Sequence, residues 1–338
     1  MTSNRPSITV FAGTNIALVK YWGKRDKALN LPATGSLSLT LANLGSETTV
    51  CFDAGHADES GKDSVFLDGS PAPESFANRV HGFLDLIRDR ADLRLPALVR
   101  TANSVPTAAG LASSAAGFAA LALAASKAAG LSLTDDELSE LARRGSGSAA
   151  RSIVGGFALM SAGSRADGKD AIARPILDPG AWDVRLVVAM TATGQKAIGS
   201  SQAMELTART SPYYPAWVAS VDRDLEDARA AILDRDLDRL GLVAERSAMR
   251  MHASAMAADP HVLYWNPGTL AAMGAVKALR AGKLSAYFTI DAGPHVKVLC
   301  AGKDAELVER TLAGTPGVLR TLSLSPGPGA RILGEPAA

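Results

Sequence analysis

The pattern of apolar and polar residues divides the first half of the chain into alternating strand-like and helix-like segments. Short segments rich in Val, Thr and Phe predict strands at 8–11, 37–41, 48–52, 65–67 and 98–101. Apolar residues recur at helical spacing over 74–90, which predicts an amphipathic helix. Further helices are expected over 113–129 and up to residue 145, the second beginning at a capping box formed by Thr134 and Glu137.

The second half begins with an apolar run, 184–190, which follows a turn cluster and predicts a buried strand. Helices are predicted at 214–233, 237–252, 269–281 and 305–312, and strands at 285–291, 296–300 and 318–324. A strand-helix-strand-strand-helix-strand order is typical of a ferredoxin-like domain. The sequence therefore predicts an α+β protein of two domains, 1–185 and 186–330, with an active-site cleft between them.

Composition and charge narrow the classes of partner. The 338 residues are 47% hydrophobic and 20% charged, which is enough for two domains with real cores. A formal net charge of +1 and 5% aromatic residues give no general attraction to nucleic acid or to a membrane, so any anion must be bound locally. Only Cys51 and Cys300 are present, and residues 1–6 lack an apolar signal region, so a cytoplasmic location is expected.

The segment Pro106-Thr-Ala-Ala-Gly-Leu-Ala-Ser-Ser-Ala-Ala-Gly117 lies between a predicted strand and a predicted helix. Small residues let the backbone approach a ligand closely, and the free N–H groups of a helix start favour phosphate. Ser113 and Ser114 add hydroxyl groups for phosphate or Mg²⁺. The pattern is neither a Walker A loop nor GxGxxG. The alternative is a small-residue turn that only lets a helix pack closely.

Two further segments place cations after predicted elements. An apolar strand leads into Lys20, Lys24 and Arg25, three cations in six residues that predict a local anion site. If a helix begins near residue 147, Ser148 and Arg151 share one face, and the arginine could bind a carboxylate or phosphate through two hydrogen bonds. The alternatives are a solvated strand end and a surface arginine on an ordinary capped helix.

The fourth segment, Tyr287-Phe-Thr-Ile-Asp-Ala-Gly-Pro294, is a strand that ends in a carboxylate. Asp291 is thus held at a rigid strand end, which suits a catalytic base or a Mg²⁺ ligand. The alternative is a turn-initiating aspartate that binds its own backbone. The five histidines show no metal-binding spacing, and no G-x-S-x-G motif is present, so neither a histidine metal site nor hydrolase chemistry is indicated. The sequence leaves open whether a side chain or only phosphates would hold Mg²⁺.

Together and in this order, these segments resemble the diphosphomevalonate decarboxylase family of the GHMP kinase superfamily. The resemblance spans roughly residues 8–325 and also includes 29–32, Ser200-Ser201, 210–214 and 250–252. It implies a two-domain GHMP-kinase-like fold, with a ribosomal protein S5 domain 2-like N-terminal domain that binds ATP and a ferredoxin-like C-terminal domain. A homodimer is expected from the resemblance, because the residues themselves carry no signal of oligomeric state.

The resemblance implies ATP-dependent decarboxylation of mevalonate 5-diphosphate to isopentenyl diphosphate, with ATP and Mg²⁺ as cofactors. By motif match, Asp291 would orient or deprotonate the C3 hydroxyl, and Arg151 would hold the substrate carboxylate. The other implied site residues are Lys20 and Ser114 in catalysis; Tyr21, Lys24, Ser148, Ser201 and Gln202 in substrate binding; and Asn103, Pro106, Gly110, Leu111, Ala112, Ser113 and Ser114 in nucleotide binding.

The sequence departs from the family pattern at three places. Ala33-Thr34-Gly35-Ser36 stands where Asn-Ser-Ser commonly follows Leu-Pro-x, Gln202 where Arg or Thr is common, and His295 where Asn is usual. Gln202 leaves open whether the substrate carries one or two phosphates. The alternatives are a sister decarboxylase or 3-kinase acting on mevalonate 5-phosphate or mevalonate, and a non-catalytic binding protein of the same fold. Lys20, Arg151 and Asp291 are all present, which argues against the last.

Overall fold

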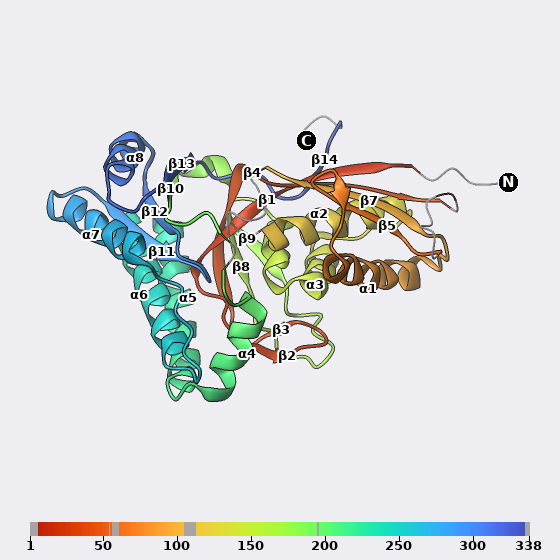
Figure 1. Cartoon of the computed structure of the whole chain (residues 1–338), viewed down its shortest axis with the longest axis horizontal. Coiled ribbons are helices and arrows are strands. Elements are labelled where there is room, and N and C mark those ends of the chain that lie inside the picture. The colour runs from red at the N-terminus through yellow and green to blue at the C-terminus, as the bar shows by residue number, and fades with distance from the viewer. Residues whose placement is uncertain (1–5, 54, 56–60, 105–112, 195, 335–338) are drawn as a thin grey trace.

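Two sheets, each covered by helices, organise the chain. The computed structural model describes residues 6–53, 55, 61–104, 113–194 and 196–334 (Figure 1). Within these residues the first sheet runs in the order β14-β1-β4-β7-β5-β6, with β8 paired to β4 and β9 to β8. Its strands are β1 (Ile8–Val19), β4 (Ser36–Phe52), β5 (Ser64–Leu67), β6 (Ser70–Pro71), β7 (Ala97–Asn103), β8 (Phe157–Met160), β9 (Ala173–Leu177) and β14 (Arg331–Ile332). A separate hairpin pairs β2 (Lys24–Asp26) with β3 (Leu31–Pro32).

Three helices cover one side of this sheet: α1 (Glu74–Ala91), α2 (Ser113–Ala128) and α3 (Asp135–Gly145) (Figure 1). The alanine-rich sequence of α2 lets it pack closely, and its residues join strand residues such as Val10 and Val99 in one core. The predicted capping box is confirmed, because Thr134 accepts the N–H of Glu137 and the Glu137 carboxylate accepts the N–H of Thr134. A 3₁₀ helix, Gly147–Ser152, follows α3.

The two strands predicted at 37–41 and 48–52 form one long strand, β4. Asn43 takes a left-handed φ of 59°, and pairing with β1 shifts register between Gly13 and Asn15. At Gly13 a Cβ would lie 2.4 Å from the carbonyl oxygen of Leu41, so glycine allows the close approach at this irregularity. The prediction was wrong because residues that usually mark a turn here mark a bend within a continuous strand.

The second sheet has the order β11-β12-β10-β13, all antiparallel. Its strands are β10 (Val184–Met190), β11 (Ala286–Ile290), β12 (Val296–Ala301) and β13 (Arg320–Leu324). One face packs on α7 (Pro267–Ala281) and α8 (Ala305–Ala313). This strand order, with both crossover helices on one face, confirms the ferredoxin-like prediction.

The other face of the second sheet shares a core with the first half of the chain. Its apolar residues pack with α5 (Tyr214–Asp234), α6 (Leu237–Met256) and the inner ends of β1 and β4. We call this set of residues the joint core; its members include Ile16, Leu39, Leu186, Val188 and Leu299. The joint core brings the end of β1 beside the end of β11, where two predicted site residues lie.

Several elements were not predicted: β8, β9, β14 and α4 (Ser200–Thr210). The short strands lack a long alternating pattern, and α4 opens with polar residues, so neither gives a strong periodic signal. None of the described helices is long and apolar enough to span a bilayer.

Candidate active site

Asp291 and Lys20 meet where the two halves of the chain come together. Lys20 follows the last residue of β1, and Asp291 follows the last residue of β11. The Lys20 Nζ lies 2.6 Å from Asp291 Oδ1, and the Lys297 Nζ of β12 lies 3.2 Å from Oδ2. The side chains of both lysines are 2% exposed, whereas that of Asp291 is 29% exposed. The carboxylate is therefore accessible to a ligand, while its two cations are buried.

The charges of this cluster favour an ionised carboxylate. Burial alone would raise the pKa of Asp291, but the ammonium groups of Lys20 and Lys297 outweigh burial and hold that pKa well below its usual range. Burial lowers the pKa of Lys20 to about 8, although Asp291 opposes the shift. Asp291 is thus a fixed negative charge and a weak base at neutral pH.

Neighbouring groups hold both side chains in place. Lys20 Nζ also donates to the carbonyl oxygen of Ala17 at 2.8 Å, and its backbone N–H donates to Ser247 Oγ at 3.0 Å. His252 Nε2 lies 3.2 Å from the carbonyl oxygen of Ile290, which only accepts, so Nε2 carries the hydrogen. Burial, with Lys20 nearby, lowers the pKa of His252 to about 3, so this histidine is neutral.

Arg151 lies in the 3₁₀ helix and is held by two side chains of the first sheet. Its Nη1 donates to Ser36 Oγ at 2.5 Å and its Nη2 to Asn15 Oδ1 at 3.1 Å. Among the described residues, neither its buried Nε nor the buried hydroxyl of Tyr21 has a hydrogen-bond partner. Burial lowers the pKa of Arg151 to about 10, so it remains a cation at neutral pH. These unused buried donors suit an anionic ligand, because an unsatisfied buried polar group is costly.

The three cations predicted to form one anion site are separated. Lys20 is buried against Asp291, whereas Lys24 Nζ donates to Asn30 Oδ1 at 2.6 Å. Arg25 is exposed and donates to the carbonyl oxygen of Arg165 at 3.2 Å. Lys20 follows β1 of the first sheet, whereas Lys24 and Arg25 are successive residues of β2 in the separate hairpin. Successive strand residues point to opposite faces, which is why closeness in sequence does not bring these cations together.

The remaining predicted substrate residues come from two elements. Ser148 is half-buried in the 3₁₀ helix, and its carbonyl oxygen accepts from Asn15 Nδ2 at 2.9 Å. Ser201 and Gln202 are exposed in the first turn of α4. The segment before α4 is tied to the Asp291 turn, because Lys196 Nζ donates to the carbonyl oxygen of Ala292 at 3.0 Å and to Ser200 Oγ at 2.7 Å.

The predicted nucleotide residues lie around the start of α2. Pro106, Gly110, Leu111 and Ala112 fall outside the described residues, while Ser113 begins α2 and Ser114 is exposed. Asn103 ends β7 and accepts a hydrogen bond from Ser46 Oγ at 2.7 Å. A small crevice nearby is lined by Thr48, Phe76, Val80, Val99, Thr101, Gly117, Phe118 and Leu121. This crevice is small and largely apolar, and it lies between β4, β7, α1 and α2.

Mg²⁺ has no preformed cage in the part of the chain that the structure describes, where no three His, Cys, Asp or Glu side chains gather. Exposed Ser114 at the helix start fits an ion that is bound mainly through nucleotide phosphates.

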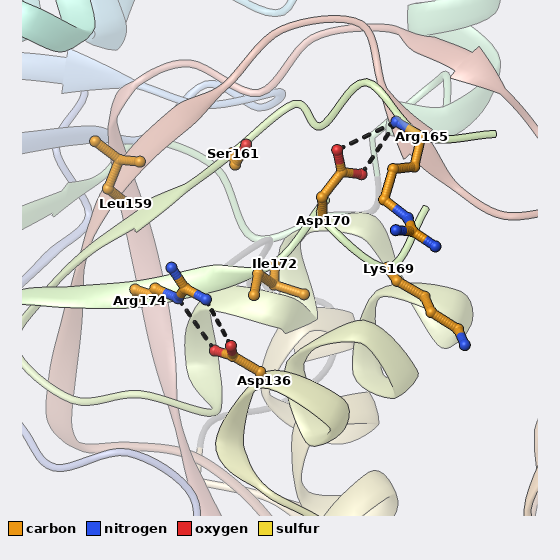
Figure 2. A pocket seen from close by; sticks show the side chains of 8 residues that line it. All are labelled: Asp136, Leu159, Ser161, Arg165, Lys169, Asp170, Ile172 and Arg174. Carbon is orange, nitrogen blue, oxygen red and sulfur yellow. Dashed lines mark hydrogen bonds and ion pairs between the residues drawn. The ribbon is translucent and has the colours of Figure 1, made fainter. Parts of the chain in front are cut away.

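A larger hollow lies elsewhere, between the start of α3, β8, β9 and the loop before β9 (Figure 2). Arg174 pairs with Asp136 at 2.7 Å, and the backbone N–H of Arg165 donates to Asp170. None of the predicted site residues lines this hollow. Its charged pairs are exposed, so it does not have the desolvated charges found around Asp291.

Sequence reasoning missed three residues of the site: Asn15, Lys297 and a role for His252. The sequence analysis places Lys297 only within the strand predicted at 296–300, and a strand lysine ordinarily faces solvent. The available signal was the pattern Val296-Lys-Val-Leu-Cys300, since a lysine inside an otherwise apolar strand is unusual.

Comparison with known proteins adds independent observations. Residues 12–173 match the family model described as the diphosphomevalonate decarboxylase-like N-terminal domain, and residues 186–316 match the mevalonate 5-diphosphate decarboxylase C-terminal domain. The diphosphomevalonate decarboxylase mvd1 of Aspergillus fumigatus is 35% identical over 327 residues, covering 91% of this chain and 80% of the relative.

Solved structures are similar over nearly the whole chain. The crystal structure of mevalonate diphosphate decarboxylase from Staphylococcus aureus superposes with a TM-score of 0.90 at 36% identity, covering 97% of this chain and 98% of the other. The complex of MDDEF with MVAPP, AMPPCP and magnesium has a TM-score of 0.89 at 40% identity, with the same coverage. The two-domain architecture expected from the sequence is thus confirmed.

Proposed function

This chain belongs to the diphosphomevalonate decarboxylase family, and we propose that it catalyses the ATP-dependent decarboxylation of mevalonate 5-diphosphate to isopentenyl diphosphate. ADP, phosphate and carbon dioxide are the other products. The observation that carries the proposal is the ionised, partly exposed carboxylate of Asp291 near the desolvated guanidinium of Arg151. One fixed negative and one fixed positive charge are what this reaction requires.

Arg151 binds the carboxylate that will leave as carbon dioxide. Its Nη atoms are already held by Ser36 and Asn15, so the guanidinium plane is fixed before substrate arrives. Tyr21, whose ring centroid lies 6.0 Å from the guanidinium carbon, borders the same end of the substrate. Binding a planar carboxylate through a preorganised guanidinium costs little reorganisation.

Asp291 acts on the tertiary C3 hydroxyl, which receives the γ-phosphoryl group of ATP. Phosphoryl transfer passes through a loose transition state, so little proton removal is needed before the new bond forms. A carboxylate with a lowered pKa therefore orients the hydroxyl and accepts its proton late. Because its pKa is lowered, the carboxyl group passes this proton on to solvent and is ionised again before the phosphate leaves. Positive charge then develops at C3, and the carboxylate stabilises it. The C–C bond electrons then form the double bond as carbon dioxide departs.

The nucleotide is proposed to bind in the domain 1–185, across the start of α2, with the second domain, 186–330, closing the site. Asn103 and the apolar crevice hold the base, while Ser113, Ser114 and the 106–112 segment hold the phosphates. Mg²⁺ would be held mainly through these phosphates, beside Ser114, and would supply neutralisation of the phosphate charge there.

A direct assay tests the proposal. Purified protein is incubated with ATP, Mg²⁺ and either mevalonate 5-diphosphate or mevalonate 5-phosphate, and carbon dioxide release is measured. The proposal predicts release from the 5-diphosphate with a higher kcat/KM. Preference for the 5-phosphate would support the sister enzyme instead, and a phosphorylated product without carbon dioxide would support a 3-kinase. No ATP-dependent turnover of either compound, or of mevalonate, would favour a binding protein.

Replacing Gln202 with arginine is expected to improve recognition of the terminal phosphate. Gln202 is exposed in the first turn of α4 and offers only neutral hydrogen bonds, whereas a charge-assisted bond is about twice as strong. KM for the 5-diphosphate should fall by roughly threefold to tenfold, and less for the 5-phosphate. The gain should shrink with added salt, because a partly exposed ion pair is screened.

The control is Gln202→Met, which removes the amide without adding charge. Measuring kcat/KM for both substrates at two ionic strengths completes the test. If the ratio of the two kcat/KM values is the same in wild type and Gln202→Arg, residue 202 does not face the terminal phosphate.

The protein is further proposed to work as a homodimer in the cytoplasm. Cys300 is a buried thiol outside any disulfide, as a reducing compartment maintains. Light scattering coupled to size-exclusion chromatography should give about twice the mass of one chain; the mass of one chain would refute the dimer.

A further inference from the structure

We propose that Lys297 is a positioning residue, which fixes the orientation of the Asp291 carboxylate for the reaction; this inference rests on the proposed function. Lys297 has no contact with a substrate in the mechanism above. Its role is to act through Asp291, from the strand next to the one that carries the carboxylate.

The place of Lys297 in the sheet is unusual for a lysine. On β12 it pairs with Thr289 of β11 and with Val188 of β10, in the middle of the second sheet. Val188 and Leu299, on the same face, belong to the joint core. Only 2% of the Lys297 side chain is exposed. An apolar residue of similar size would fill this place without the cost of burying a charge.

Asp291 compensates the buried charge of Lys297. The Lys297 Nζ lies 3.2 Å from Asp291 Oδ2, while the Lys20 Nζ lies 2.6 Å from Oδ1. With Lys20 alone, the carboxylate could still turn about its Cβ–Cγ bond. A second ammonium on the other oxygen fixes its plane. The two cations come from β1 and β12, so both halves of the chain orient this group.

The charged and titratable groups around Asp291 all come from different elements. Lys20 follows β1, Lys297 lies on β12, Lys196 precedes α4, Arg151 lies in the 3₁₀ helix and His252 lies on α6. Of the four cations, Lys20 and Lys297 form ion pairs with the carboxylate. His252 is neutral and binds the backbone of Ile290. Lys297 is therefore the second direct determinant of the carboxylate's charge and orientation.

Replacing Lys297 with methionine tests the proposal. The variant keeps the volume of the side chain and removes its charge. We expect kcat to fall by about 10–100-fold, since small displacements of a reacting group cost up to about 10²-fold, while KM for ATP stays within about twofold. Lys297→Arg retains the charge and should recover most of kcat.

The pH profile separates positioning from a merely structural role. In the wild type, the pKa of Asp291 lies far below its usual range, so kcat should not fall with pH until the protein unfolds. Without Lys297 the burial effect remains and one cation is lost, so the pKa of Asp291 rises. Because the ionised form is the active one, kcat of Lys297→Met should then fall as pH drops through the raised pKa. A ¹³C NMR titration of the Asp291 carboxyl in the free protein measures the same pKa without any reaction.

Val188→Ala is the matched control, because Val188 pairs with Lys297 and is equally buried. It should lower the melting temperature but leave the acid limb of the pH profile unmoved.

If Lys297→Met does not fold, Lys297→Gln replaces it in every measurement. If the wild-type protein releases no carbon dioxide, the proposed function is wrong. The effect of Lys297 on the pKa of Asp291 can still be measured by NMR in that case. The role of Lys297 is overturned if the wild type is active and the folded variant has the same kcat, the same pH profile and the same pKa of Asp291.

Discussion

Turnover of the Asp291→Asn variant is expected to fall by at least about 10²–10⁴-fold, the usual contribution of a catalytic acid–base group. The amide keeps the shape of the side chain but removes the negative charge. The variant therefore lacks both the acceptor for the C3 hydroxyl proton and the negative charge that stabilises positive charge at C3. Carbon dioxide release under saturating ATP measures the loss, and binding of an ATP analogue should change little.

The fold of Asp291→Asn should persist, although at lower stability. Breaking a buried ion pair costs about 3–5 kcal/mol when the remaining charge stays buried. Here two lysines, Lys20 and Lys297, lose their partner. The pKa of Lys20 is already about 8 with Asp291 present, so without the carboxylate this lysine loses its proton near neutral pH and adds little to the cost, which then comes mainly from Lys297.

The matched control for this variant is Asp224→Asn. Asp224 is a buried carboxylate on α5 that pairs with Arg246 at 2.8 Å and Arg250 at 3.3 Å, away from the candidate site. It should lower the melting temperature while leaving kcat close to that of the wild type. Near wild-type turnover of folded Asp291→Asn would remove Asp291 from the mechanism.

The second large effect is expected for Arg151→Lys. A lysine ammonium is a point charge and cannot bind Ser36 and Asn15 while presenting a planar edge to a carboxylate. Losing even one charge-assisted hydrogen bond costs about 1.5–3 kcal/mol, so kcat/KM for mevalonate 5-diphosphate should fall by roughly 10–150-fold. The effect should appear in turnover and far exceed any change in KM for ATP.

Arg143→Lys gives a matched comparison. Arg143 is also fully buried, but it donates to the carbonyl oxygens of Leu29, Gly168 and Ala171 and supports only the fold. Its replacement should lower the melting temperature more than it lowers kcat/KM. A rise in KM for ATP alone in Arg151→Lys would place Arg151 in the nucleotide site instead.

Much of the fold could be predicted because its helices have a clear apolar period and defined ends. The helix predicted at 74–90 is α1, and the strand predicted at 184–190 is β10 with the same bounds. The bend in β4 could not be predicted, because Asn43 and Gly45 have the same local signature whether the chain turns back or continues. Only the pairing with β1, a long-range contact, decides between the two.

The predicted site depended on motifs, and its missing members are those whose role is decided by tertiary packing. Asp291 follows a strand and Arg151 lies in a short helix after a glycine- and serine-rich segment, so both belong to motifs that can be recognised in the sequence. Asn15, which orients Arg151, lies 136 residues away from it in sequence. Lys297 lies close to Asp291 in sequence, but only the pairing of β11 with β12 and the burial of this face of the sheet place its ammonium 3.2 Å from the carboxylate instead of in solvent.

The path of the chain after β13 has a consequence for how the protein folds. Pro326 bridges to Leu41, a Cβ at Gly155 would lie 2.7 Å from the backbone N of Gly329, and β14 pairs with β1. The residues of the second sheet are thus inserted, in sequence, between β9 and β14 of the first sheet. The first sheet is complete only when β14, near the end of the chain, pairs with β1. Because β1 also enters the joint core, loss of either sheet removes supporting contacts from the other. We therefore expect the two sheets to fold and unfold as one cooperative unit. Strand β1 connects them directly, because β14 pairs with it near its first residues and Lys20 follows its last residue.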